Sequence, residues 1–187
     1  MGFSAYYALE EKTGKQVWRF DTQGEAMPGA LYADGVLYIA TGDGHMYALM
    51  ARTGQLKWKT DLGGFVSMSS INRFGDLLYV GCSNPNFIYA INRHTGDIVW
   101  KQTIAGIANT GMGDNSPVVD EKRKLVIQDA IVDANPEQKT SGFAIFAMDA
   151  ATGAIKWQTN VGRGPTPPAY KAGVAMVHDA GYFSVAR

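Results

Sequence analysis

One phrase of twelve residues occurs four times in this sequence, and its fixed spacing constrains the fold more than any other feature. Every copy begins with an aromatic residue and an alanine, continues to a Thr-Gly pair, and ends on a tryptophan four residues after the glycine. The copies are YALEEKTGKQVW from Tyr7, YALMARTGQLKW from Tyr47, YAINRHTGDIVW from Tyr89 and FAMDAATGAIKW from Phe146. Four matches at one spacing indicate a repeat protein, in which each copy is one supersecondary unit.

Each copy has the pattern of a β-hairpin. A short apolar run leads into the Thr-Gly pair, where glycine supplies the positive φ that a tight turn needs. The run after the turn carries the tryptophan, whose large ring offers apolar area to a neighbouring layer. Two more short strands precede each hairpin: ALYADGVLYIATGDGHMYAL contains a strand, an Asp34-Gly35 turn, the apolar strand VLYIA and an Asp43-Gly44 turn.

Four short strands per unit, with tryptophans 40, 42 and 57 residues apart, predict a β-propeller of four-stranded antiparallel blades. No segment has a convincing helical period, so the fold class is all-β. The expected divisions are a partial blade at 1–23, blades at 24–62, 63–104 and 105–161, and a partial blade at 162–187.

The two partial blades are complementary, because the chain starts on the third strand of one blade and ends on the first strands of another. Three interpretations follow: a four-bladed ring closed by the terminal strands, two copies forming one eight-bladed ring, or a longer chain that carries further blades. The third is preferred, since half a ring leaves open strand edges. The expected partners are therefore the remaining blades, in the same chain or a second copy, or another protein.

Composition excludes some classes of function. Seventeen basic residues balance seventeen acidic ones, which argues against a nucleic-acid footprint. Cys82 is the only cysteine, so no intrachain disulfide is expected. No apolar run reaches membrane-spanning length, and the first residues lack the pattern of a signal peptide.

The unit at 105–161 is the longest, and its extra residues identify a candidate site. Compared with the preceding unit, residues are added before its first strand (IAGIANTGMGDNS) and between its second and third strands (DAIVDANPEQKTSG). Propeller topology places both additions on one face, opposite the Thr-Gly turns. Loops on a rigid scaffold often carry function. The polar residues expected to form a pocket wall or lid there are Asn109, Asp114, Asn115, Asp129, Asp133 and Asn135. The alternative is a solvated pair of loops.

The Ala-x₄-Thr-Gly-x₃-Trp pattern resembles the tryptophan-docking motif of the quinoprotein-type (PQQ-repeat) β-propellers, over essentially the whole chain. Full rings in that family commonly have eight blades. The resemblance implies that neighbouring blades dock through the repeat residues, which are Trp18, Trp58, Trp100, Trp157, Gly14, Gly54, Gly96 and Gly153. Members include PQQ-dependent dehydrogenases, outer-membrane assembly scaffolds and hydrolases such as tetrathionate hydrolase, so the fold alone does not fix the function.

The dehydrogenases of this family bind PQQ and calcium on the face that carries the long loops. The segment YVGCSNPN resembles their Gly-x-Gly-Asn-Pro segment and nominates Asn84 as a calcium ligand, with a plain Asn-Pro turn as the alternative. The resemblance also has two gaps. No aspartate follows Trp100 before Asp114, where the dehydrogenases hold their catalytic base, and their adjacent cysteine pair is absent.

These gaps favour a binding or scaffold propeller segment over an enzyme, with no certain cofactor. The alternatives are part of a PQQ- and calcium-dependent dehydrogenase, for which the long loops would hold the cofactor, or a related hydrolase such as tetrathionate hydrolase. The resemblance to the family implies export to the periplasm.

Overall fold

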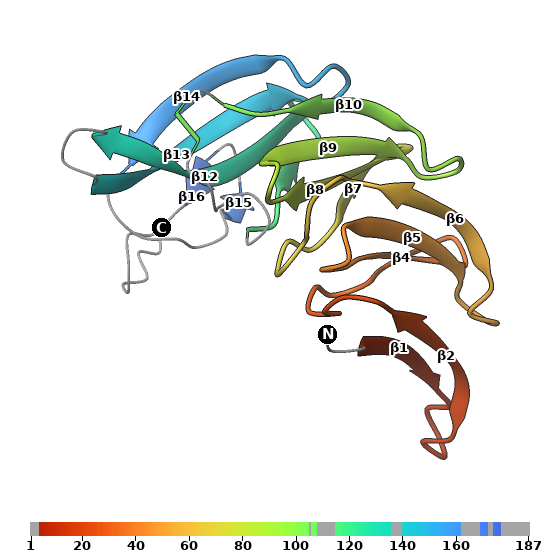
Figure 1. Cartoon of the computed structure of the whole chain (residues 1–187). Coiled ribbons are helices and arrows are strands. Elements are labelled where there is room, and N and C mark those ends of the chain that lie inside the picture. The colour runs from red at the N-terminus through yellow and green to blue at the C-terminus, as the bar shows by residue number, and fades with distance from the viewer. Residues whose placement is uncertain are drawn as a thin grey trace.

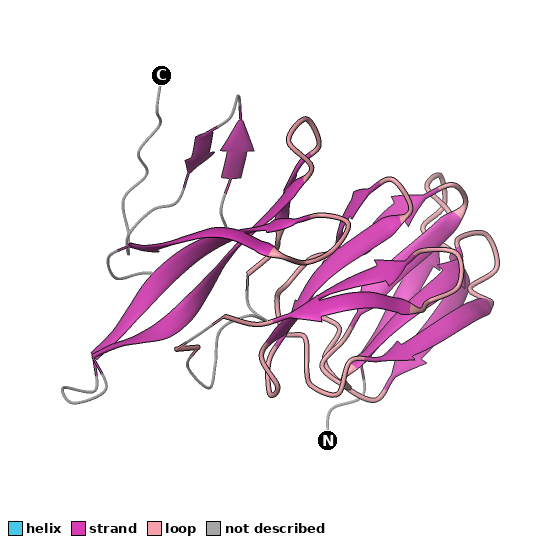
Figure 2. Cartoon of the chain, turned by 90° about the horizontal axis from the view of Figure 1, so that it is seen from above, coloured by secondary structure: helices cyan, strands magenta, loops and turns pink. Residues whose placement is uncertain are grey.

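The computed structural model describes residues 4–104, 106–107, 115–135, 140–161, 169–171 and 174–176. Every regular element in these ranges is a β-strand, as Figure 2 shows, and the all-β prediction is therefore confirmed. With no helix among the described residues, none of them belongs to a helix that could cross a membrane.

The described strands form three four-stranded sheets and two two-stranded sheets, all antiparallel. The first complete sheet contains β3 (Leu31–Ala33), β4 (Val36–Ala40), β5 (His45–Met50) and β6 (Leu56–Asp61). The second contains β7 (Asn72–Phe74), β8 (Leu77–Cys82), β9 (Phe87–Asn92) and β10 (Ile98–Gln102). The third contains β11 (Val118–Asp120), β12 (Leu125–Asn135), β13 (Thr140–Asp149) and β14 (Ile155–Val161). The two-stranded sheets are β1 (Ser4–Leu9) with β2 (Gln16–Thr22), and β15 (Ala169–Lys171) with β16 (Val174–Met176).

The sheets follow one another around an arc (Figure 1). The first strands of successive sheets are neighbours at the inner side, since β11 lies against both β7 and β15. In each complete sheet the chain runs outward from the first strand to the fourth, which carries the repeat tryptophan. The sheets are therefore blades, and we call the three complete ones blades 2, 3 and 4 in chain order.

Each repeat tryptophan of blades 1 to 3, where blade 1 is β1–β2, contacts the Thr-Gly turn of the next blade. Its indole N–H donates a hydrogen bond to the carbonyl three residues before the turn glycine: Trp18 to Ala51 (2.9 Å), Trp58 to Arg93 (3.0 Å) and Trp100 to Ala150 (3.0 Å). A Cβ added to Gly54, Gly96 or Gly153 would lie only 2.7–2.8 Å from a ring atom of that tryptophan. We call this arrangement the interblade joint.

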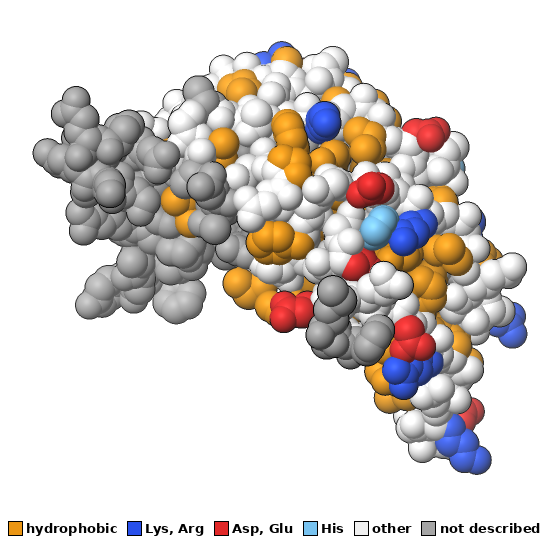
Figure 3. All heavy atoms as spheres, in the orientation of Figure 1, with side chains coloured by type: hydrophobic (Ala, Val, Ile, Leu, Met, Phe, Trp, Pro, Cys, Tyr) orange, Lys and Arg blue, Asp and Glu red, His pale blue; other side chains and the backbone are white. Residues whose placement is uncertain are grey.

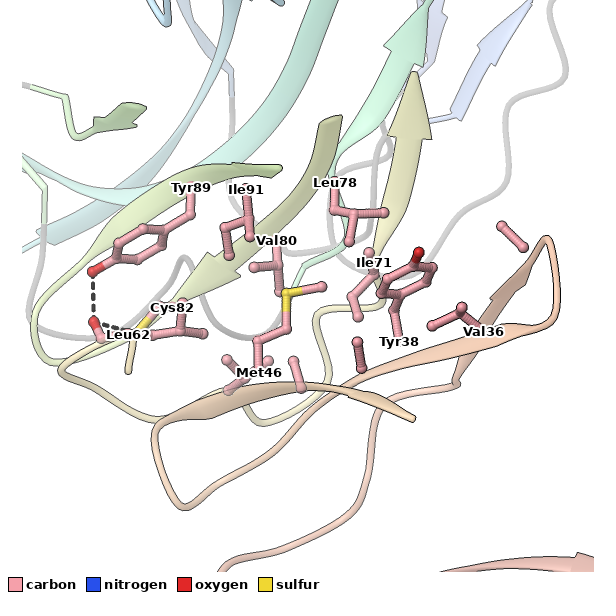
Figure 4. Close-up of a cluster of buried hydrophobic side chains, with 14 residues drawn as sticks. Val36, Tyr38, Met46, Leu62, Ile71, Leu78, Val80, Cys82, Tyr89 and Ile91 are labelled. Carbon is pink, nitrogen blue, oxygen red and sulfur yellow. Dashed lines mark hydrogen bonds between the residues drawn. The ribbon is translucent and has the colours of Figure 1, made fainter. Parts of the chain in front are cut away.

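Between the joints, apolar side chains fill the space from one sheet to the next. Figure 4 shows the cluster between blades 2 and 3, where Met46 of β5 faces Val80 of β8. The Tyr89 hydroxyl at its edge donates a hydrogen bond to the carbonyl of Leu62. Because alternate residues of each strand face opposite neighbours, blades 2 and 3 each contribute to two such clusters.

Blade 4 differs from the expectation of two added loops. Strands β12 and β13 have 11 and 10 residues, against six each in β8 and β9. Their ladder continues from the Leu125–Asp149 pair to the Asn135–Thr140 pair, so most of the second addition is an extended hairpin. The physical reason is β-propensity: Ile131 pairs with Phe143 inside the added stretch, and β-branched and aromatic residues favour strands.

Candidate functional site

One position on the second strand differs in chemistry between the three complete blades. Ladder register makes Ala40, Gly81 and Asp129 equivalent. Each lies four residues after the start of the second strand, and that start pairs with the last residue of the third strand. Blades 2 and 3 have a small residue there, and blade 4 has a carboxyl. The position lies toward the hairpin that joins the second and third strands, at the opposite end of the blade from the Thr-Gly turn.

Asp129 is buried, with only 3% of its surface exposed, and it pairs with Asn115. The Asn115 Nδ2 donates a hydrogen bond to Asp129 Oδ2 at 3.1 Å. Gln128 fixes the backbone on both sides, because its Nε2 donates to the carbonyls of Asn115 (3.0 Å) and Asp129 (3.1 Å). In blade 3 the corresponding contact is a smaller one, from the Gly81 N–H to the Ser69 hydroxyl. We call Asn115, Gln128 and Asp129 the blade-4 polar cluster.

The blade-4 polar cluster is incompletely satisfied. Asp129 Oδ1 and Gln128 Oε1 are both buried and have no hydrogen-bond partner among the described residues. Leaving a buried polar atom unpaired costs about 1–3 kcal/mol. Burial raises the pKa of Asp129 to about 7, against the lowering effects of its backbone and Asn115 hydrogen bonds. A buried carboxyl that titrates near neutrality and has one oxygen unpaired is a candidate for binding or proton transfer.

A second aspartate, Asp43, provides a comparison, because both of its carboxylate oxygens accept hydrogen bonds. Asp43, between β4 and β5, accepts hydrogen bonds from the Tyr47 hydroxyl (2.7 Å) and the His45 N–H (3.1 Å), and also from the Thr41 hydroxyl. Burial would raise the pKa of Asp43, but the hydrogen bonds from Thr41 and Tyr47 outweigh it and the pKa is lowered. Asp43 therefore stays ionised as a turn residue. The contrast with Asp43 leaves Asp129 as the aspartate whose pKa burial raises, to about 7.

The raised pKa of Asp129 leads to a prediction about how the free energy of unfolding depends on pH. The folded state holds a proton on Asp129 up to about pH 7, whereas an unfolded aspartate loses it near 3.8, so this residue's contribution to stability falls as pH rises between these values. We expect Asp129→Asn to gain stability relative to the wild type across that window, by on the order of 4 kcal/mol. Urea denaturation of both proteins from pH 4 to 8 measures the difference. A constant difference would show that Asp129 has an ordinary pKa.

The other predicted site residues do not join this cluster in the described structure. Asn84 is exposed in the turn between β8 and β9, with φ of 50°. No hydrogen bond links Asn84 to Asn115 or Asp129 within the described residues. Asn109 and Asp114 lie outside those residues, and so do the side chains of Asp133 and Asn135, whose backbones end β12.

The family resemblance implies a calcium site with Asn84 as one of its ligands. Calcium takes six to eight oxygen ligands. In the described part of the chain no three His, Cys, Asp or Glu residues gather to hold a metal ion, and Asn84 is exposed in a turn of blade 3. The described residues alone therefore do not form a calcium site, and the role of Asn84 as a calcium ligand stays a prediction.

Radial four-stranded sheets joined by tryptophan and glycine define the class of protein, a β-propeller built from a repeated blade. The chain belongs to the PQQ-repeat propeller family: residues 4–166 match the family profile described as "Outer membrane protein assembly factor BamB". Among solved structures, the chain is similar to the quinohemoprotein alcohol dehydrogenase ADHIIG from Pseudomonas putida HK5, with a TM-score of 0.69 and 18% identity. That match covers 85% of this chain and 31% of the other, and it confirms the propeller fold.

Two proteins named tetrathionate hydrolase are similar in sequence. The one from Acidithiobacillus ferrooxidans is 38% identical over 180 residues, which is 96% of this chain and 36% of that protein. The one from Acidianus ambivalens is 35% identical over 140 residues, which is 68% of this chain and 26% of that protein. The chain thus spans about a third or less of the length of these relatives.

Proposed function

We propose that this chain builds part of a propeller hydrolase that acts on tetrathionate, and that Asp129 exchanges the proton. The observation that carries the proposal is the 38% identity to a tetrathionate hydrolase along 96% of the chain. The buried acid of blade 4 adds a chemical reason. A hydrolase needs a group that gives or takes a proton near the working pH, and Asp129 is the described carboxyl whose pKa is raised to about 7.

The geometry suits an acid. Asn115 donates to Oδ2 at 3.1 Å and so orients the carboxyl, while the buried Oδ1 has no hydrogen-bond partner among the described residues. Below pH 7 the neutral carboxyl does not repel an anion such as tetrathionate. When water adds across a sulfur–sulfur bond, its oxygen bonds to one sulfur, the Asp129 proton goes to the sulfur that leaves, and a water proton returns to the carboxylate.

The direct test is turnover. Purified protein is incubated with tetrathionate at pH 4 to 8, and the loss of tetrathionate is followed by ion chromatography against heat-denatured protein. We expect loss above the control rate, greatest on the acid side of pH 7, where Asp129 is protonated. Absence of both turnover and saturable tetrathionate binding would contradict the proposal.

A second candidate is the binding or scaffold propeller that the missing dehydrogenase residues favour. The observation that supports it is the match of residues 4–166 to a profile named for an outer-membrane assembly factor. Acidic and basic side chains are interspersed on the described part of the face shown in Figure 3, so that face carries no single charge sign. Export to the periplasm is part of either proposal. This candidate predicts no turnover of tetrathionate by a well-folded protein.

A third candidate function is that of a quinoprotein, with PQQ bound on the face that carries the additions of blade 4. The likeness to the alcohol dehydrogenase supports it. Adding PQQ and Ca²⁺ to the purified protein decides it. A saturable change in PQQ absorbance together with a raised melting temperature would favour a quinoprotein, and loss of both in Asn84→Ala would place the calcium ligand.

A further inference from the structure

The joint between blades 2 and 3 differs from the other two joints at one residue. The carbonyl that accepts the indole hydrogen bond belongs to an alanine in blades 2 and 4, Ala51 and Ala150, but to Arg93 in blade 3. The Arg93 carbonyl accepts from Trp58, as in every joint, and also from the Tyr38 hydroxyl of blade 2 at 3.3 Å. A methyl side chain cannot form an ion pair, so of the three joints only this one has a charge at the acceptor position.

The guanidinium of Arg93 connects two turns that belong to different blades. Its Nη1 donates to Oδ2 of Asp34 at 2.5 Å, and Asp34 lies in the turn between β3 and β4 of blade 2. Its Nε donates to Oδ1 of Asp76 at 3.0 Å, and Asp76 lies in the turn between β7 and β8 of blade 3. The Arg93 side chain is 15% exposed, so protein atoms cover most of the cation that holds the two carboxylates. We call Asp34, Asp76 and Arg93 the ionic latch.

Two further basic side chains border the ionic latch. Arg73 of β7 reaches the same oxygen of Asp34 at 3.4 Å, and His94 Nε2 lies 3.0 Å from Oδ1 of Asp76. Their side chains are 39% and 56% exposed, so water screens both contacts more than it screens those of Arg93. The pair of Arg93 and Asp34 is therefore the strongest of these contacts that cross from blade 3 to blade 2.

We propose that the ionic latch makes the joint between blades 2 and 3 open locally when ionic strength rises, while the joints on either side do not respond. Dissolved salt screens the attraction between charges, whose range falls from about 10 Å at 0.1 M to about 3 Å at 1 M. The joint then loses the ion pairs that tie its two turns together and keeps only its uncharged contacts. Trp58 is partly buried, whereas Trp18 and Trp100 are 8% and 9% exposed, so packing covers this joint less than the other two.

Hydrogen exchange of the indole N–H groups measures the opening of each joint. The N–H of a joint tryptophan exchanges with solvent when its hydrogen bond to the next blade breaks. The ¹⁵N-labelled protein is followed by NMR in deuterated buffer of one pH, at 0.1 M and at 1 M NaCl. Trp18 and Trp100 are controls within the same sample. We expect the exchange of Trp58 to accelerate about 3- to 5-fold more than that of either control, the scale of one ion pair at a protein surface.

Two substitutions remove the ionic latch in different ways. Asp34→Asn removes the charge that blade 2 contributes and keeps the shape, and asparagine tolerates the positive φ (50°) of this turn. Arg93→Ala gives this joint the residue of the other two joints and keeps the carbonyl that accepts from Trp58. In both variants Trp58 should exchange faster than in the wild type at 0.1 M NaCl, and its response to salt should equal that of Trp100. Circular dichroism should show both variants folded.

Asp21→Asn is the matched control, because Asp21 forms an exposed ion pair with Arg19 that lies within blade 1. This variant should keep the wild-type salt response at Trp58. An equal salt response of the three indoles in the wild type, or a Trp58 response that survives in either latch variant, would overturn the proposal. None of these measurements involves tetrathionate or Asp129, so their outcome is separate from the test of the hydrolase.

Discussion

Replacing Trp100 with alanine will lower the free energy of unfolding by about 3–5 kcal/mol, the usual cost of truncating a buried aromatic residue. The ring is 9% exposed, packs on Tyr79 with centroids 5.9 Å apart, and lies over Gly153. Its N–H donates to the Ala150 carbonyl. The substitution therefore removes the joint between blades 3 and 4 and leaves a cavity. Urea denaturation monitored by far-ultraviolet circular dichroism measures the loss.

The neighbouring residue provides the control. Val99 is on the same strand but is 49% exposed, and Val99→Ala should change stability by no more than about 0.5 kcal/mol. If the two variants lost similar stability, the tryptophan would be acting through strand propensity and not through the joint.

If the chain is part of a tetrathionate hydrolase as proposed, we expect Asp129→Asn to reduce the turnover of tetrathionate about 10²- to 10⁴-fold, the usual contribution of general acid–base catalysis. Asparagine has the same shape and its amide oxygen can accept the Asn115 hydrogen bond, but it cannot exchange a proton. The defect should therefore fall on kcat with the fold intact. Steady-state rates across pH 4 to 8 measure it, and the fall of the wild-type kcat as pH rises through about 7 should be absent from any residual activity.

Asp97→Asn is the matched control, because Asp97 is an exposed aspartate beside the Thr95-Gly96 turn, at the opposite end of a blade. Its turnover should equal that of the wild type. Full activity in Asp129→Asn would remove Asp129 from the reaction, although the turnover itself would still support the hydrolase.

The repeat alone was enough to predict the strands, because their signals are local. A Thr-Gly pair fixes a turn, the flanking apolar runs fix two strands, and the tryptophan marks the fourth strand of each unit. Blade 4 shows where local signals are insufficient. Asp133 and Thr140 have polar side chains that suggest a loop, yet the ladder continues through them, since Ile131 and Phe143 extend the pairing.

The candidate site was predictable only in part. Composition nominated Asn115 and Asp129 separately, as polar residues of an enlarged unit. Their hydrogen bond depends on how the segment before β11 lies against β12, which is a tertiary contact. One signal in the sequence was available: aligning the blades puts Asp129 at the position of Gly81 and Ala40. Gln128 had no such signal, because a glutamine next to an aspartate is ordinarily solvated, and here it is fully buried.

In the interblade joint, the indole N–H of the tryptophan donates only to main-chain carbonyl oxygens of the next blade. The acceptor carbonyls belong to Ala51, Arg93 and Ala150, and their side chains take no part in the hydrogen bond from the indole. Mutation can therefore change the side chains at these acceptor positions without removing the hydrogen bonds between neighbouring blades, as long as the turn glycines are kept. Related propellers can therefore differ in surface charge and shape at these turns and keep the same packing of one blade on the next.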